Sequence, residues 1–95
     1  MAASDESELV KMINTSTDIN DRPCAFRYPR GTGLGSILPT IDEKIEIGKS
    51  KIIQEGKKLA ILNFGARLNE TLKAAENLKK KGVNITIVDM SLIHI

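Results

Sequence analysis

The fold of this chain is decided by residues 59–89, which read LAILNFGARLNETLKAAENLKKKGVNITIVD. The stretch opens with a short apolar run, Leu59 to Leu62, of the kind found in buried parallel strands. β-Branched side chains from Val83 to Asp89 predict a second strand. Two such strands on either side of a helical segment predict an α/β fold with a parallel sheet.

A helix is expected between these strands, from about Arg67 to Lys81. Its inner face is formed by apolar residues at helical spacing, namely Leu68, Leu72, Ala75 and Leu78. The turn Asn63-Phe64-Gly65 leads into the helix, and Gly82 is its expected C-terminal cap. Strand, helix and strand within about 30 residues predict a right-handed βαβ crossover.

The first 30 residues predict a helix, a turn and a strand. Ser4 is the expected helix N-cap, and an apolar stripe follows at Leu9, Val10, Met12 and Ile13. β-Compatible side chains alternate from Cys24 to Tyr28 and predict a strand, which Pro29 ends because it lacks a backbone N–H donor.

Residues 31–50 differ in character and predict a boundary between two units. Glycines at 31, 33 and 35 make the first part flexible, and no helical period follows. Ile45, Ile47, Ile52 and Ile53 predict two short strands that turn at Gly48.

Two arginines flank the end of the expected strand and make it a candidate anion site. Arg27 and Arg30 each offer a rigid fork of donors that suits a phosphate, and Gly31 lets the backbone approach a ligand. Ligands of open α/β sheets bind at the carboxyl ends of the strands. The sequence therefore predicts two alternatives of equal weight: phosphate binding by these three residues, or a pair of surface arginines beside a turn.

Two other segments have part of a nucleotide-binding pattern. In Gly31-Thr32-Gly33-Leu34-Gly35 the third glycine comes one residue early and Pro39 follows instead of a helix, so we interpret this segment as a linker. The turn at Asn63 contains one glycine, and Asp89 lies about where a ribose-binding acid would stand. A structural turn is favoured there, with cofactor binding as the alternative.

The composition narrows the functional classes. A net charge of +2 is too small to indicate nucleic acid as a partner, and no apolar run approaches the roughly 18 residues that cross a bilayer. Cys24 is the single cysteine, which excludes an internal disulfide; we expect it to be buried and inert, in a soluble intracellular chain. His94 is interpreted as part of a frayed terminus rather than as a catalytic base.

The string Arg27-Tyr28-Pro29-Arg30-Gly31, with Ser4-Asp5-Glu6 before it and residues 58–65 after it, resembles 1-deoxy-D-xylulose-5-phosphate synthase. That family consists of thiamine-diphosphate enzymes of the transketolase type, and the resemblance covers residues 1–93.

The resemblance implies partial three-layer α/β units, divided along the chain. Residues 1–30 would end the pyrimidine-binding domain, 31–50 would link the domains, and 51–95 would begin the C-terminal domain. We therefore expect this chain to be a fragment of such an enzyme.

The resemblance also implies an activity. The family condenses pyruvate with glyceraldehyde 3-phosphate, releases carbon dioxide, and supplies isoprenoid, thiamine and pyridoxal phosphate synthesis. It implies a homodimer that binds thiamine diphosphate and Mg²⁺ between its domains. The expected location is the cytoplasm, or the plastid if the source is a plant or alga. In the family the arginine of Tyr-Pro-Arg-Gly contacts the substrate phosphate, and here that arginine is Arg30. Arg27 is the weaker candidate, with a structural ion pair as its alternative, and Gly31 lets the chain turn beside the ligand.

The same resemblance also implies that this chain lacks several functional segments of the family. It lacks the Gly-Asp-Gly type segment that holds metal and diphosphate, the activating glutamate and the proton-shuttling histidines, so we expect neither bound cofactor nor catalysis. Two alternatives stay open: a module that binds a phosphorylated metabolite through Arg27 and Arg30, and a module that docks onto a partner through exposed sheet edges. Open strand edges also predict weak stability, self-association or both.

Overall fold

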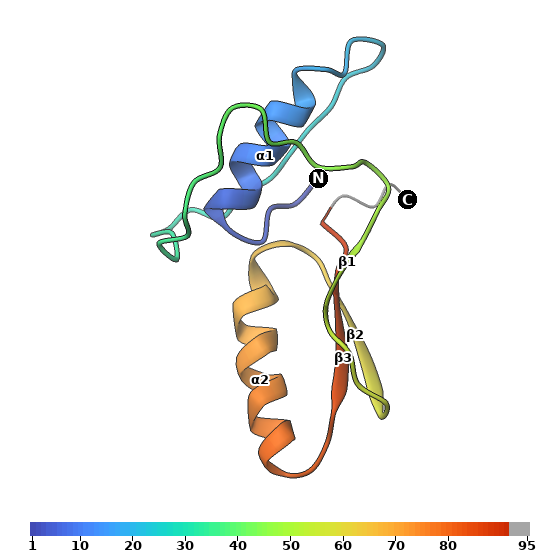
Figure 1. The fold of residues 1–95 in the computed structure, drawn as a ribbon. Coiled ribbons are helices and arrows are strands. Elements are labelled where there is room, and N and C mark those ends of the chain that lie inside the picture. The colour runs from blue at the N-terminus through green and yellow to red at the C-terminus, as the bar shows by residue number, and fades with distance from the viewer. Residues whose placement is uncertain (92–95) are drawn as a thin grey trace.

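The computed structural model describes residues 1–91 of the chain. In chain order, its elements are α1 (Glu6–Ser16), β1 (Lys51–Gln54), β2 (Leu59–Asn63), the short 3-10 helix η1 (Gly65–Arg67), α2 (Leu68–Lys80) and β3 (Ile85–Asp89). The molecule is elongated, with α1 and its surrounding loops at one end and the sheet with α2 at the other (Figure 1). Each end has an apolar cluster of its own.

The three strands form one mixed sheet in the order β1-β3-β2. β2 and β3 are parallel, with pairs running from Leu59 opposite Ile85 to Asn63 opposite Asp89, and α2 connects them. The predicted α/β fold class and its parallel crossover are therefore confirmed. β1 is antiparallel to β3 and pairs Ile52 with Val88.

Helix α2 begins and ends close to the predicted residues. η1 precedes it, so the regular helix starts at Leu68 instead of Arg67. At its end Gly82 has a φ of +78°, its N–H donates to the Lys79 carbonyl, and the Val83 N–H donates to the Leu78 carbonyl. This pair of bonds is a Schellman motif, which glycine permits because it has no Cβ to clash in the left-handed conformation.

The main core lies between α2 and one face of the sheet. Alternate residues of β3, Ile85 and Ile87, are fully buried there, and Ala75 meets them from the middle of α2. The remaining contacts come from partly buried apolar residues, namely Ile53, Ile61, Leu68, Leu72, Leu78 and Val83. The predicted inner face of the helix is thus confirmed.

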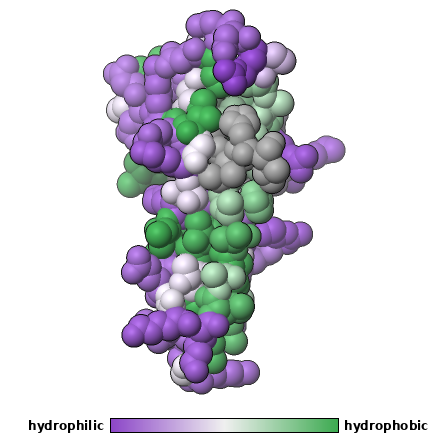
Figure 2. Space-filling model, turned by 90° about the vertical axis from the view of Figure 1, so that its right-hand side faces the viewer, coloured by the Kyte–Doolittle hydropathy of each residue, from purple (hydrophilic) through white to green (hydrophobic). Residues whose placement is uncertain are grey.

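The opposite face of the sheet has no helix over it among residues 1–91 (Figure 1). Val88 pairs with Ile52 on one side and Leu62 on the other, and those two side chains are 57% and 56% exposed. Figure 2, which views this side of the molecule, shows apolar side chains along the part that contains the sheet. The prediction of a fully buried strand at Leu59–Leu62 is therefore wrong, because one helix covers only one face.

The predicted strand from Cys24 to Tyr28 is also wrong. Only Arg27 makes a β-type pairing, a single parallel bridge to Ala2, because no neighbouring strand is present to extend the ladder. Without that sheet Tyr28 is 65% exposed, and Cys24 is exposed instead of buried.

Helix α1 is capped one residue later than predicted. Asp5, not Ser4, is the N-cap, and its side chain accepts a hydrogen bond from the Glu8 N–H at 2.7 Å. The Glu8 side chain in turn accepts from the Ser4 N–H at 2.9 Å. The backbone N–H groups of Ser4 and Glu8 at the helix start therefore both have side-chain acceptors, as in a capping box. On the inner side Met12 is fully buried with Ala3.

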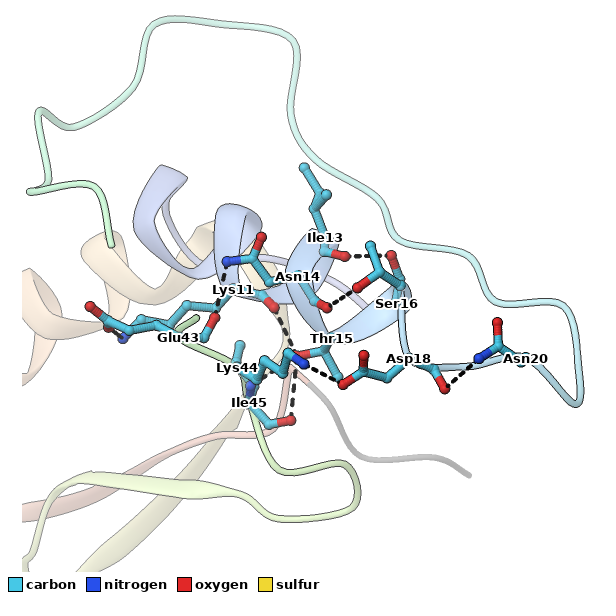
Figure 3. Close-up of polar contacts among 11 residues, drawn as sticks. Lys11, Ile13, Asn14, Thr15, Ser16, Asp18, Asn20, Glu43, Lys44 and Ile45 are labelled. Atoms are coloured by element: carbon cyan, nitrogen blue, oxygen red, sulfur yellow. Dashed lines mark hydrogen bonds and ion pairs between the residues drawn. The ribbon is translucent and has the colours of Figure 1, made fainter. Parts of the chain in front are cut away.

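Segment 31–50 contains no helix or strand, and only one of the two predicted isoleucine strands forms. The Ile45 N–H donates to the Thr15 hydroxyl at 2.9 Å, so its backbone is bound to α1 and not to a neighbouring strand (Figure 3). The Asn14 side-chain amide donates to the carbonyls of Thr40 and Glu43, at 3.2 and 3.1 Å. The predicted turn at Gly48 is present, with a φ of +84°.

Candidate anion-binding pocket

A pocket of about 480 Å³ lies where three parts of the chain meet. They are the start of α1, the segment 28–34 and the start of α2. Its charged and polar wall residues are Ser4, Asp5, Glu6, Tyr28, Arg30, Thr32, Asn69 and Glu70. The tertiary structure thus brings the Tyr-Pro-Arg-Gly string against residues that are distant in sequence.

Two of the three residues predicted for anion binding line this pocket. Arg30 and Gly31 are in its wall, and Arg27 is not. The Arg27 backbone instead holds the N-terminal segment: its N–H donates to the Met1 carbonyl at 2.9 Å and its carbonyl accepts from Ala3 at 3.3 Å. Within residues 1–91 the Arg27 side chain joins no ion pair, so that alternative is not realised there.

The three carboxylates in the wall already have partners. Glu70 pairs with Arg67 at 2.6 Å, and Asp5 accepts from Glu8 and from the Ser36 hydroxyl at 3.1 Å. Glu6 accepts three backbone N–H groups of the following loop. By contrast, the Arg30 guanidinium has no hydrogen-bond or ion-pair partner among residues 1–91. Arg30 is therefore the charged group of the pocket whose donors remain for a ligand.

The contact of Glu6 with the glycine loop could not be predicted from sequence. Its carboxylate accepts from the N–H groups of Leu34 at 3.0 Å, Gly35 at 2.5 Å and Ser36 at 2.9 Å. The hydrogen bond from its own backbone N–H, together with those from the loop, lowers the pKa of Glu6 from its usual value of 4.5, against a smaller opposing effect of desolvation. The only signal in the sequence was the pair of glycines at 33 and 35, which allow backbone N–H groups to converge on an anion.

The polar residues at the carboxyl end of the parallel strands form turns. Buried Asn63 donates from Nδ2 to the Gly65 carbonyl at 3.0 Å, and buried Asp89 accepts from the N–H and hydroxyl of Ser91. Because these groups bond to the chain itself, the structure supports the interpretation of this edge as structural. The predicted frayed residue His94 lies outside the described residues.

Neither a metal site nor a membrane span is found in the described part of the chain. No three side chains of His, Cys, Asp or Glu in residues 1–91 are grouped as a metal ion requires. Neither α1 nor α2 is long and apolar enough to cross a bilayer.

Comparison with known proteins finds a family profile and solved structures that match this chain. A protein-family profile described as transketolase, C-terminal domain, matches residues 48–95. A solved structure described as "Split gene transketolase, inactive beta4 tetramer" is similar with a TM-score of 0.51 and 28% sequence identity, over 60% of this chain. The similar region makes up 19% of that structure's chain, so this chain spans about a fifth of its length.

Proposed function

This chain belongs to the transketolase C-terminal domain family, and we propose that it is part of a thiamine-diphosphate enzyme of the transketolase type. The match of residues 48–95 and the parallel β2–α2–β3 crossover support this proposal. A similarity that covers a fifth of a split transketolase chain is consistent with a role as one part of a larger active assembly.

Within that class, the proposed enzyme is 1-deoxy-D-xylulose-5-phosphate synthase. Support comes from the string Arg27-Tyr28-Pro29-Arg30-Gly31, by which the sequence resembles that family. The overall reaction joins the two carbons that remain of pyruvate after loss of carbon dioxide to the aldehyde carbon of glyceraldehyde 3-phosphate, and thiamine diphosphate bound elsewhere in the enzyme would supply the electron sink for it. In this proposal the chain binds the phosphate end of the acceptor aldehyde.

The observation that carries the proposal is the position of Arg30. Arg30 is an exposed residue that lines the 480 Å³ pocket, and its guanidinium has no partner among residues 1–91. A phosphate monoester would receive two parallel N–H···O bonds from it, the strongest type of hydrogen bond available to a side chain. The Thr32 hydroxyl and the Asn69 amide line the same pocket and can donate to the remaining oxygens.

The sequence lacks the Gly-Asp-Gly type segment that holds metal and diphosphate in the family that it resembles. We therefore derive no step of the reaction through thiamine diphosphate from this chain, and assign its binding to other parts of the proposed enzyme.

The test is a titration of the 95-residue chain with glycerol 3-phosphate, in which binding is monitored by proton–nitrogen correlation spectra. This analogue keeps the phosphate monoester and lacks the aldehyde, which would react with lysines. Arg30→Ala should raise the dissociation constant at least about tenfold, because a charge-assisted hydrogen bond contributes about 1.5–3 kcal/mol. Glycerol, without phosphate, should not bind.

Arg22→Ala is the matched control, since Arg22 pairs with Asp21 and lies outside this pocket. Equal affinity of the wild-type chain and the Arg30→Ala variant would contradict the proposal.

A second candidate function is docking onto a partner chain. The exposed apolar face of the sheet around Ile52 and Leu62 favours it (Figure 2), as does the tetrameric assembly of the similar split transketolase. Arg30→Ala separates the two functions, because it should abolish phosphate binding and leave docking through the sheet unchanged.

A further inference from the structure

The segment that carries Arg30 is held at its two ends and not in its middle. No hydrogen bond or ion pair within residues 1–91 involves residues 28–33. On one side of this segment Arg27 is bonded through its backbone to Met1 and Ala3. The position of Arg30 in the pocket therefore depends on these end contacts.

The contact at the other end is the Glu6 carboxylate. Its Oε1 accepts from Gly35 and Ser36 and its Oε2 accepts from Leu34, so one side chain binds three successive N–H groups. Glu6 belongs to the first turn of α1, which begins from the same N-terminal segment that holds Arg27. Both ends of the Arg30 segment are consequently bound to residues 1–6.

The Glu6 carboxylate lies directly against the loop at Gly33. A Cβ on Gly33 would lie 2.7 Å from Glu6 Oε1, a separation that real Cβ atoms do not tolerate. Gly35 has a φ of +81°, which turns the following N–H groups toward the carboxylate. The loop thus has the shape of an anion-binding nest, and its anion belongs to the chain itself.

We propose that Glu6 is a positioning residue for the phosphate site: its carboxylate fixes the loop at residues 34–36 and thereby holds Arg30 at the pocket. This inference rests on the proposed function of Arg30. The Glu6 carboxylate also occupies the three N–H groups, so an incoming phosphate binds at Arg30 and not in the nest.

The experiment compares the wild-type chain with Glu6→Gln, which keeps the size of the side chain and removes its charge. Heteronuclear proton–nitrogen Overhauser effects of Gly31 and Gly33 measure the order of the segment, and glycerol 3-phosphate titration measures the site. Glu6→Gln should lower those Overhauser effects and weaken binding about fivefold, the lower end of typical coupling between two sites.

Glu43→Gln is the matched control. Glu43 also binds a loop to α1, by accepting the Thr40 N–H at 3.3 Å and pairing with Lys11 at 3.3 Å, but it does not line the pocket. It should change neither the Overhauser effects of Gly31 and Gly33 nor the affinity. Gly33→Ala gives a second variant that keeps the charge: its Cβ displaces the end of the Glu6 side chain from the three N–H groups and should reproduce the loss.

Unchanged order and affinity in both Glu6→Gln and Gly33→Ala would overturn the inference. Tighter binding by Glu6→Gln would also overturn it, because the vacated N–H groups would then be the phosphate site. Absence of binding by the wild-type chain would refute the proposed function instead, and the Overhauser effects would still decide whether Glu6 holds the segment.

Discussion

Loops that direct successive N–H groups at one point usually bind a ligand, and here they bind the carboxylate of Glu6. This contact links the first turn of α1 to a loop 28 to 30 residues further along the chain. The pKa of Glu6 is lowered first by the hydrogen bond from its own backbone N–H and then by those from the loop N–H groups, so the ionised form is favoured in the folded state. The strength of the contact therefore depends on pH.

The sign of that dependence can be tested with Glu6→Gln. A folded-state pKa below the unfolded value of 4.5 stabilises the fold above that pH, and this contribution is lost as pH falls through the folded-state pKa. The melting temperature of the wild-type chain should exceed that of Glu6→Gln near neutrality, and the difference should shrink below about pH 4. Thermal melts by circular dichroism at both pH values measure it.

Glu76→Gln serves as the charge control, since Glu76 lies on the exposed side of α2 and accepts no hydrogen bond from residues 1–91. If the difference in melting temperature between the wild-type chain and Glu6→Gln stayed the same in acid, the stabilising role of the ionised Glu6 carboxylate would be contradicted.

Among the secondary-structure elements, the connection between β1 and β2 packs closely against β3 at Gly56. The Thr86 hydroxyl accepts from the Gly56 N–H and donates to the Gly56 carbonyl, both at 2.9 Å. A Cβ on Gly56 would meet the Ile85 backbone at 2.5 Å. Glycine is therefore required here for a close approach between two backbones.

Gly56→Ala should destabilise the chain by about 1–3 kcal/mol, because the added methyl must displace a strand of the core sheet. Gly31→Ala introduces the same methyl where no atom lies within 4 Å, and should change the free energy of unfolding by less than about 0.5 kcal/mol. Urea denaturation of both variants compares them directly. Equal stability of the two would show that the turn moves away without cost.

For the whole molecule, the decisive feature is a sheet covered on one face only. Ile52 and Leu62 are more than half exposed on the uncovered face, and β1 and β2 are both edge strands. Apolar faces and open edges of this kind favour association between chains. The expectation of weak stability, self-association or both stays a prediction.

Leu62→Lys should reduce concentration-dependent association, because a charge on the exposed face must lose its hydration when two faces meet. Sedimentation velocity over a range of concentrations measures the effect. Ile37→Lys is the matched control, since Ile37 is 92% exposed in a loop outside the sheet. A wild-type chain that remained monomeric at all concentrations would refute the association.

The 95-residue chain is also expected to be inactive. Incubated with pyruvate, glyceraldehyde 3-phosphate, thiamine diphosphate and Mg²⁺, it should release no carbon dioxide above the background. The reason is that the sequence lacks the cofactor-binding segment of the family that it resembles. Formation of 1-deoxyxylulose 5-phosphate by the purified chain would contradict this prediction.

The sequence by itself determined the elements whose causes are local. The apolar spacing of α2, the β-branched residues of β3 and the glycine of the Schellman motif act within a few residues, so 59–89 could be predicted almost to the residue. Arg30 and Gly31 were identified as candidates because their chemistry is intrinsic to them.

Only the tertiary structure decided the features that depend on distant partners. Cys24 to Tyr28 has the side chains of a strand and forms none, because a strand needs a neighbour to satisfy its N–H and C=O groups. The role of Glu6 could not be predicted for a similar reason. Its contact closes a loop of about 30 residues, and neither sequence spacing nor residue type specifies which of the chain's carboxylates will accept those N–H groups.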